Sequence, residues 1–103
     1  MPVLTGLPGT SGSVPVVFFR SAAECIRIMR HDSDAVTAAS DNGCINVWRD
    51  RDGNLHAHVQ QHRRTVDDAE FGEVGYRRLS KWISPRLKAI REPGRIGPWE
   101  RKK

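Results

Sequence analysis

The chain has 103 residues, of which 38% are hydrophobic and 28% are charged. This length fits one domain and leaves no room for a second hydrophobic core. No apolar run approaches the roughly 20 residues that cross a bilayer, residues 1–14 lack the pattern of a secretory signal, and two cysteines are too few for a disulfide-stapled secreted domain. We therefore expect a cytoplasmic protein that has no membrane partner.

The net charge of +5 is concentrated at the C-terminal end of the chain. Residues 1–85 carry equal numbers of basic and acidic side chains, whereas residues 86–103 carry seven basic side chains against two acidic ones. Such a segment raises the affinity for any polyanion without conferring specificity. The same composition is also typical of a chain end that only improves solubility.

Composition divides the chain into three parts. Residues 1–14 are rich in Gly, Pro, Ser and Thr, which predicts a flexible N-terminal arm. Residues 92–103 combine Pro and Gly with basic side chains, which predicts a flexible basic tail. Residues 15–91 between them are predicted to form a single α+β domain.

The domain is expected to begin with a short β-type run and a helix. Residues 14–19 could form an extra edge strand, a position in which Pro15 is tolerated. Ser21 and Glu24 have the spacing of a capping box, which predicts a helix from there to about His31. Its apolar stripe, at helical spacing, is Ala22, Cys25, Ile26 and Met29.

Three β-type runs follow, at residues 35–40, 44–49 and 54–62. Asn42 and Gly43 separate the first two runs and tolerate positive φ, which predicts a tight type I′ hairpin. We therefore expect a three-stranded antiparallel meander.

The loop around Gly53 fixes how the second and third runs pair. A two-residue loop would place Val47 opposite His58 and would mix apolar and polar side chains on each face. A three-residue loop with a left-handed Gly53 places Val47 opposite Ala57 and gives one apolar face. We predict the latter, so the opposite face displays Cys44, Asn46, Trp48, His56, His58, Gln60 and His62.

A second helix is predicted to begin at Thr65, with acidic side chains early and basic side chains late. Gly72 and Gly75 should weaken it, and Pro85 should break it before a last short turn through Ile90. The predicted fold class is therefore α+β, with two helices on one face of the meander and the order (β)-α-β-β-β-α.

Metal binding and catalysis receive little support. His56, His58 and His62 could share one face of a strand, but the first and last are about 20 Å apart on a straight strand, so one ion cannot be bound by both. Cys25 lies on the apolar stripe and is interpreted as a core residue. We expect no catalytic residue, no metal and no cofactor.

Nucleic-acid binding, to DNA or RNA, is the function that the sequence favours most. Basic side chains and an aromatic ring on which a base can stack are the usual components of such a site. The candidates are Trp48 and the histidines on the open sheet face, an arginine pair after the third strand, and the basic side chains of the second helix and the tail. They are Trp48, His56, His58, Arg63, Arg64, Arg77, Arg78, Lys81, Arg86, Lys88 and Arg91.

The α-β-β-β-α order over about residues 21–91 resembles that of double-stranded-RNA-binding domains, in topology alone. The resemblance implies recognition of A-form shape by helix and loop contacts. Those domains place lysines at the start of the second helix, where this chain has Asp67, Asp68, Glu70 and Glu73. An acidic helix start would oppose phosphate binding there.

A protein partner is the alternative. An exposed Trp48 among Asn, His and Gln has the composition of an interface core, and arginine outnumbers lysine thirteen to four, which suits pairing with an acidic protein surface. The same sheet face could form a homodimer. This interpretation predicts an inhibitor or adaptor of the kind found in phages and mobile elements.

Overall fold

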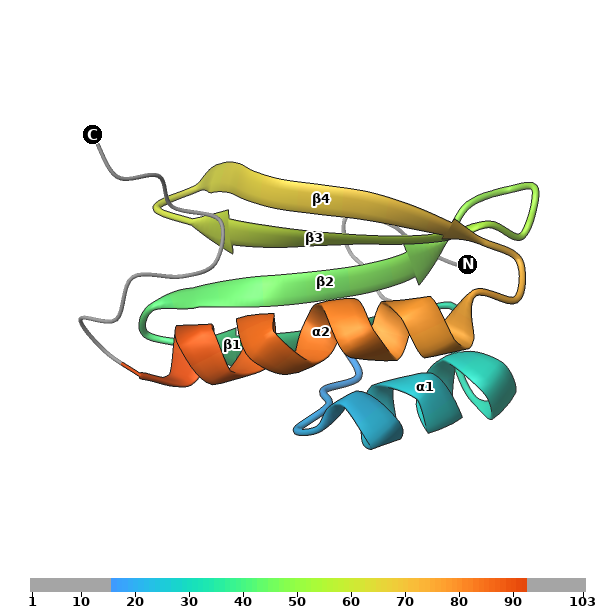
Figure 1. The fold of residues 1–103 in the computed structure, drawn as a ribbon, viewed down its shortest axis with the longest axis horizontal. Helices are drawn as coiled ribbons and strands as arrows, with labels where there is room; N and C mark the ends of the chain where they lie inside the picture. The colour runs from blue at the N-terminus through green and yellow to red at the C-terminus, as the bar shows by residue number, and fades with distance from the viewer. Residues whose placement is uncertain (1–15, 93–103) are drawn as a thin grey trace, which may run out of the picture.

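The computed structural model describes residues 16–92 and shows an α+β fold with a four-stranded antiparallel sheet and two helices. Both helices lie on the same side of the sheet (Figure 1). In chain order the elements are α1 (Ala22–His31), β1 (Ala35–Ser40), β2 (Gly43–Arg49), β3 (Leu55–Gln61), β4 (Arg64–Gly72) and α2 (Tyr76–Arg91). The predicted arm, residues 1–14, and all of the predicted tail except Glu92 lie outside the described residues.

Helix α1 begins where the sequence predicts. The Ser21 hydroxyl accepts a hydrogen bond from the Glu24 amide at 3.0 Å, and the Glu24 carboxylate accepts one from the Arg20 amide at 2.8 Å. The second bond reaches one residue beyond the amide of a standard capping box. Cys25 is fully buried, and this burial raises the pKa of its thiol to about 12. Cys25 is therefore a core residue, as expected.

The predicted pairing of β2 with β3 is confirmed. Ile45 lies opposite Val59 and Val47 lies opposite Ala57, and Gly53 is left-handed with φ 88°. All four side chains are buried beneath the helices. Burial of a Val or Ile side chain stabilises the fold by about 1.5–3 kcal/mol, so a slip of one residue would be strongly unfavourable.

The turn between β1 and β2 differs from the prediction by one residue. Ser40 pairs with Gly43, so Asp41 and Asn42 form the turn. A Cβ atom on Gly43 would lie 2.7 Å from the Gln60 carbonyl oxygen, which no side chain can do without a shift. Gly43 also has a φ of 149°, so both its backbone conformation and the close approach of two strands require glycine.

The predicted helix start at Thr65 is wrong, because residues 64–72 form β4. His62 and Arg63 both have positive φ, 52° and 66°, which is the backbone of a tight hairpin turn. The strand satisfies the free edge of β3 and buries Phe71. Four strands therefore lie between the two helices in chain order, and the topological resemblance to double-stranded-RNA-binding domains does not hold.

Helix α2 starts at Tyr76 and continues through Pro85, so the predicted break is also wrong. Residues on both sides of the proline bury their side chains, which stabilises the helix across the missing backbone hydrogen bond. The buried side chains are Leu79, Ile83, Leu87, Ala89 and Ile90. Gly72 and Gly75 precede the helix and do not weaken it.

The segment before α1 contacts the other edge of the sheet. Phe18 forms a single parallel bridge with Thr37 of β1, supported by hydrogen bonds from the Thr37 amide to Val17 at 2.9 Å and from the Phe19 amide to Thr37 at 3.0 Å. The expected N-terminal edge strand is thus one bridge, and the fourth strand lies at the opposite edge. Within residues 16–92, neither helix has the length and apolar character needed to cross a bilayer.

Candidate functional site

The outer face of the sheet, away from the helices, carries Trp48, His56 and His58 side by side. His56 lies opposite Trp48 and His58 lies opposite Asn46 in the β2–β3 ladder. The Trp48 ring is stacked on the His56 ring, with centroids 5.4 Å apart and planes 10° from parallel, and meets the His58 ring edge-on at 5.0 Å. The three rings therefore form one contiguous cluster, as the predicted strand pairing requires.

His56 is held between two carboxylates. Its Nε2 atom lies 2.7 Å from Asp50 Oδ2, and its Nδ1 atom lies 3.9 Å from Glu70 Oε2. The hydrogen bond from His56, together with the backbone amides of Asn54 and Asp52, lowers the pKa of Asp50 to about 2. The Asp50 carboxylate therefore stays ionised over the whole physiological range.

His58 is held in place by a hydrogen bond with the side-chain amide of Asn46. Thr37 donates a hydrogen bond to Asn46 Oδ1 at 2.6 Å, which turns the amide nitrogen toward His58 Nε2 at 2.8 Å. Desolvation lowers the pKa of His58, and the charge of Asp68 opposes that shift. With an amide donor on Nε2 and a lowered pKa, His58 is neutral at pH 7 and accepts a hydrogen bond there.

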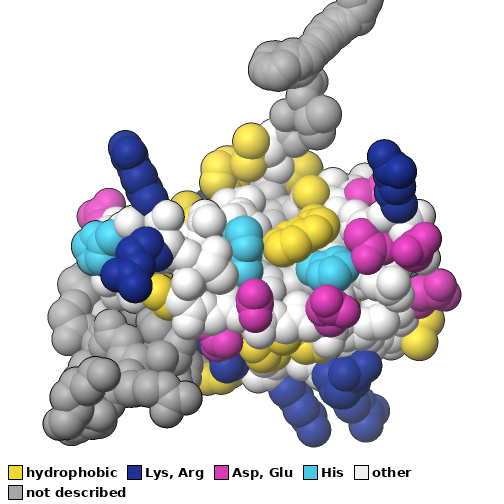
Figure 2. All heavy atoms as spheres, turned by 90° about the horizontal axis from the view of Figure 1, so that it is seen from above, with side chains coloured by type: hydrophobic (Ala, Val, Ile, Leu, Met, Phe, Trp, Pro, Cys, Tyr) yellow, Lys and Arg dark blue, Asp and Glu magenta, His cyan; other side chains and the backbone are white. Residues whose placement is uncertain are grey.

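The charge on the outer face is acidic where it surrounds the histidines. Asp68 and Glu70 of β4 lie opposite His58 and His56. Figure 2 views the molecule from the side opposite the helices and shows His and acidic side chains in the middle, with Lys and Arg side chains around the outline. Carboxylates in this position repel phosphate, so the histidine–tryptophan face is the less favourable of the two faces for nucleic acid. Among residues 16–92, no three metal-ligating side chains are grouped to hold an ion.

Helix α2 has the opposite character. It carries six Lys or Arg side chains and no Asp or Glu. Two of the six fold back onto β4: Arg78 donates to the Phe71 carbonyl at 2.9 Å, and Arg86 donates to Asp67 at 2.6 Å. The other four are exposed, namely Arg77, Lys81, Lys88 and Arg91. The corrected helix start explains this charge, because the acidic residues assigned to the helix by sequence lie before it: Asp67, Asp68 and Glu70 are on β4, and Glu73 is in the connection to α2.

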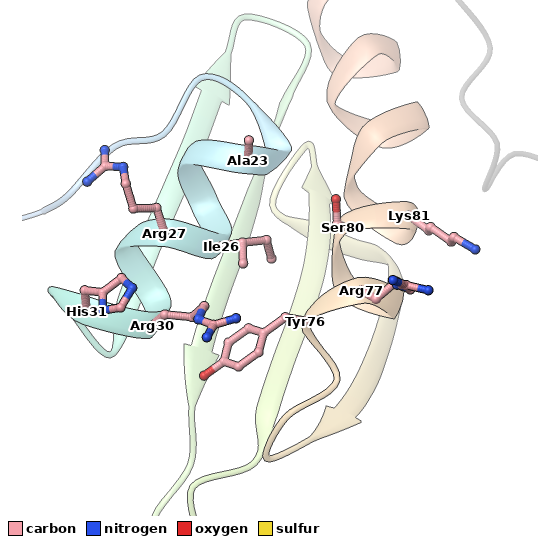
Figure 3. A pocket seen from close by; sticks show the side chains of 9 residues that line it. All are labelled: Ala23, Ile26, Arg27, Arg30, His31, Tyr76, Arg77, Ser80 and Lys81. Carbon is pink, nitrogen blue, oxygen red and sulfur yellow. The ribbon is translucent and has the colours of Figure 1, made fainter.

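A groove of about 660 Å³ lies between α1 and the first half of α2. Its lining contains Arg27, Arg30, His31, Arg77 and Lys81 and no carboxylate. Figure 3 shows Ile26, Ala23 and Tyr76 toward the middle, Arg27 and His31 on the α1 side, and Arg77 and Lys81 on the α2 side. The groove thus has a largely apolar centre between two cationic rims.

One end of this groove is held in place by a cation–aromatic arrangement. The Arg30 guanidinium lies 5.1 Å from the centre of the Tyr76 ring. The Tyr76 hydroxyl accepts a hydrogen bond from Arg49, whose guanidinium also lies 5.7 Å from the ring centre. Contacts on the ring and on the hydroxyl together fix the orientation of Tyr76.

A second groove, of about 350 Å³, lies at the other end of the helix pair. Arg20, Lys88 and Arg91 line it, and the Arg91 side chain donates to the Arg20 carbonyl at 2.5 Å. Both grooves are lined by residues of the two helices and of the segments next to them. We call this surface the helix layer, defined by Arg20, Arg27, Arg30, His31, Arg77, Lys81, Lys88 and Arg91.

The structure divides the residues selected from sequence among separate surfaces. The Trp48 cluster lies on the outer sheet face, Arg63 and Arg64 are exposed at the β3–β4 turn, and the α2 residues belong to the helix side. Arg27, Arg30 and Tyr76 were missed as site residues. The polar side of α1 carries the first two and could have indicated them, but nothing in the sequence placed that side beside α2.

No protein-family model, curated protein or solved structure matches the chain. The proposal of function therefore depends on the geometry and charge of the two faces.

Proposed function

We propose that the protein is a non-enzymatic nucleic-acid-binding protein and that the helix layer is its binding surface. The observation that carries the proposal is the charge of α2, which has six cations and no anion along its length. Four of these cations are exposed and do not fold back onto β4, and two of them join Arg27 and Arg30 of α1 around one groove. A surface of this kind attracts any polyanion by releasing the polyanion's bound counterions.

Helix stability does not explain the cations at the start of α2. Arg77 and Arg78 lie in the first turn, where the helix dipole favours anions, and no side chain caps Gly75. Arg78 has a structural contact with the Phe71 carbonyl. Arg77 has no hydrogen bond or ion pair to a carboxylate among the described residues, so its placement favours an external anion.

The dimensions of the helix suit a phosphate backbone. The exposed cations run from Arg77 to Arg91, which spans about 21 Å at the rise of an α-helix. A nucleic-acid strand offers one phosphate for about every 3.4 Å of duplex axis. The helix layer can therefore contact several phosphates at once, and such contacts carry little sequence information.

The test is a titration of labelled DNA and RNA at salt concentrations from about 50 to 200 mM, repeated with two double variants. Arg77→Glu with Lys81→Glu reverses two charges at the groove, and Arg51→Glu with Arg63→Glu reverses two exposed charges elsewhere. Each reversal removes two units of charge, so both doubles lower the net charge from +5 to +1.

We expect the groove double to weaken binding at least about tenfold and to reduce the salt slope by about 2. The matched control should change the affinity much less. Equal losses in both doubles would show that net charge alone attracts the nucleic acid. No affinity for DNA or RNA at the lowest salt would refute the proposal.

A protein partner is the second candidate, and the outer sheet face supports it. Trp48 is held rigidly by two imidazoles yet remains partly exposed, which is the state of an interface anchor before binding. Trp48→Ala should then abolish capture of the partner or, for a homodimer, convert it to a monomer in sedimentation. Helix-layer variants should leave that interaction unchanged.

A further inference from the structure

We infer that the groove between α1 and α2 receives a nucleobase of a single-stranded nucleic acid, while its rims hold the flanking phosphates. This inference rests on the proposed function and adds the kind of strand that is bound. It starts from the distribution of side chains in the groove, which is not uniformly basic. Ala23, Ile26 and Tyr76 lie toward the middle, and the cations lie on the two sides (Figure 3).

A smooth duplex cannot use such a centre. The bases of a duplex are stacked and paired, so a rod laid across the helix layer would contact only the rims. A single strand can turn its bases outward and place them on apolar or planar groups. Ile26 and Tyr76 also pack against the hydrophobic core, and the part of this apolar centre that the groove exposes can contact nucleic acid only if a base leaves the strand axis.

The groove contains planar groups on which a base can stack. Arg30 lies over the Tyr76 ring at 5.1 Å, and both side chains line the groove. A guanidinium plane and an aromatic ring are the two surfaces on which unpaired bases stack in proteins. The Tyr76 ring is fixed by Arg49, so little side-chain entropy is lost when a base stacks there.

The volume fits one base with its sugar. A groove of about 660 Å³ falls within the usual range for small-ligand sites. The two cationic rims come from different helices, Arg27 from α1, which is also paired with Asp32 at 3.4 Å and Glu24 at 3.9 Å, and Arg77 and Lys81 from α2. A phosphate on each side of the bound base would thus meet a different helix.

The experiment compares three ligands of equal length, about 12 nucleotides each. They are a single strand, the same strand with abasic sites, and the duplex. The abasic strand keeps every phosphate, so it separates base contacts from charge. We expect the single strand to bind at least about fivefold more tightly than the abasic strand.

A groove-filling variant tests the location. Ala23→Leu with Ser80→Leu crowds the groove from both walls without changing a charge. The matched control, Ala39→Leu with Thr65→Leu, adds the same side chains at exposed positions outside both grooves. The filled groove should lose the preference for bases and keep the salt slope, whereas the control should keep both.

The outcomes separate the two proposals. Equal affinity of the wild type for the intact and abasic strands would overturn this inference and leave the phosphate-binding function in place. A base preference that survives in the filled variant would also overturn it, because the base would then lie elsewhere. Failure of all three ligands to bind at low salt would refute both.

Discussion

The Arg49 guanidinium contacts the ring of Tyr76 and donates a hydrogen bond to its hydroxyl, which joins the end of β2 to the start of α2. The same side chain donates to the carbonyl oxygens of Gly53 at 2.8 Å, Glu73 at 3.2 Å and Met29 at 3.3 Å. One guanidinium therefore connects α1, the β2–β3 loop and the β4–α2 connection. It also positions the aromatic wall of the helix-layer groove.

Replacement of Arg49 should destabilise the whole domain. We expect Arg49→Ala to lower the free energy of unfolding by about 2–3 kcal/mol in urea titrations, because partly buried carbonyls lose a charged donor. The stability of Arg49→Lys should lie between those of the wild type and Arg49→Ala, since an ammonium cannot reach all of these acceptors. Arg51→Ala, at an exposed position in the adjacent loop, should change stability by less than about 0.5 kcal/mol. Similar losses for both alanine variants would contradict the assigned role.

Asp50 should give the domain an acid-dependent stability. Its pKa falls from 3.8 to about 2 on folding, chiefly through the hydrogen bond with His56. A lowered carboxyl pKa stabilises the folded state above pH 4, and this contribution is lost as pH falls from about 4 to 2. The urea midpoint of Asp50→Asn should therefore be below that of the wild type at pH 6, and the two should converge near pH 2. His56→Gln should remove much of the same stabilisation above pH 4. A difference between the urea midpoints of the wild type and Asp50→Asn that does not change with pH would contradict the link between the Asp50 pKa and stability.

Arg77→Glu should increase stability while it reduces binding. A carboxylate in the first turn of α2 interacts favourably with the helix dipole, worth about 0.3–1 kcal/mol, where Arg77 is unfavourable. The same change places a negative charge on the rim of the groove. The midpoint of thermal unfolding should therefore rise, while the affinity for nucleic acid in the salt titration falls. Arg77→Gln should be intermediate in both measurements. A variant that loses stability and affinity together would indicate a structural role for Arg77.

Two neighbouring glycines should respond differently to alanine. A Cβ atom on Gly75 would lie 2.0 Å from the Phe71 carbonyl oxygen, so the connection into α2 would have to move. Gly72 has open space around the same position but a φ of 71°, so alanine there meets only the left-handed backbone penalty. We expect losses of about 3 kcal/mol for Gly75→Ala and about 1 kcal/mol for Gly72→Ala in chemical denaturation. The reverse order would contradict the close approach.

The register of the central hairpin could be predicted because it depends on local alternation. Only one loop length at Gly53 places Val47 opposite Ala57, and any slip would turn buried side chains to solvent. The outward position of Trp48 and both histidines followed from that register alone. Their stacking geometry did not, because it depends on Asp50, Asn46 and Glu70, which come from three different segments.

The segment around Thr65 shows where local patterns fail. A polar residue followed by Asp67 and Asp68 has the charge order of a helix start, and its strand propensity is weak. The free edge of β3 has unpaired backbone amides and carbonyls, which an isolated segment does not meet. Residues 64–72 pair with these groups and form β4. This one change placed Asp67, Asp68 and Glu70 on the sheet instead of on α2.

The sequence by itself determined the helix at Ser21, the apolar face of the hairpin and the excess of positive charge, since each depends on residues close together in the chain. Only the tertiary structure decided which face of the molecule carries each charge. The pairing of β4 with β3 places acidic side chains beside His56 and His58. The packing of α1 on α2 brings Arg30 to Tyr76, which is 46 positions away in the chain. Contacts between segments so distant depend on how whole elements fill the core, and no local spacing encodes them.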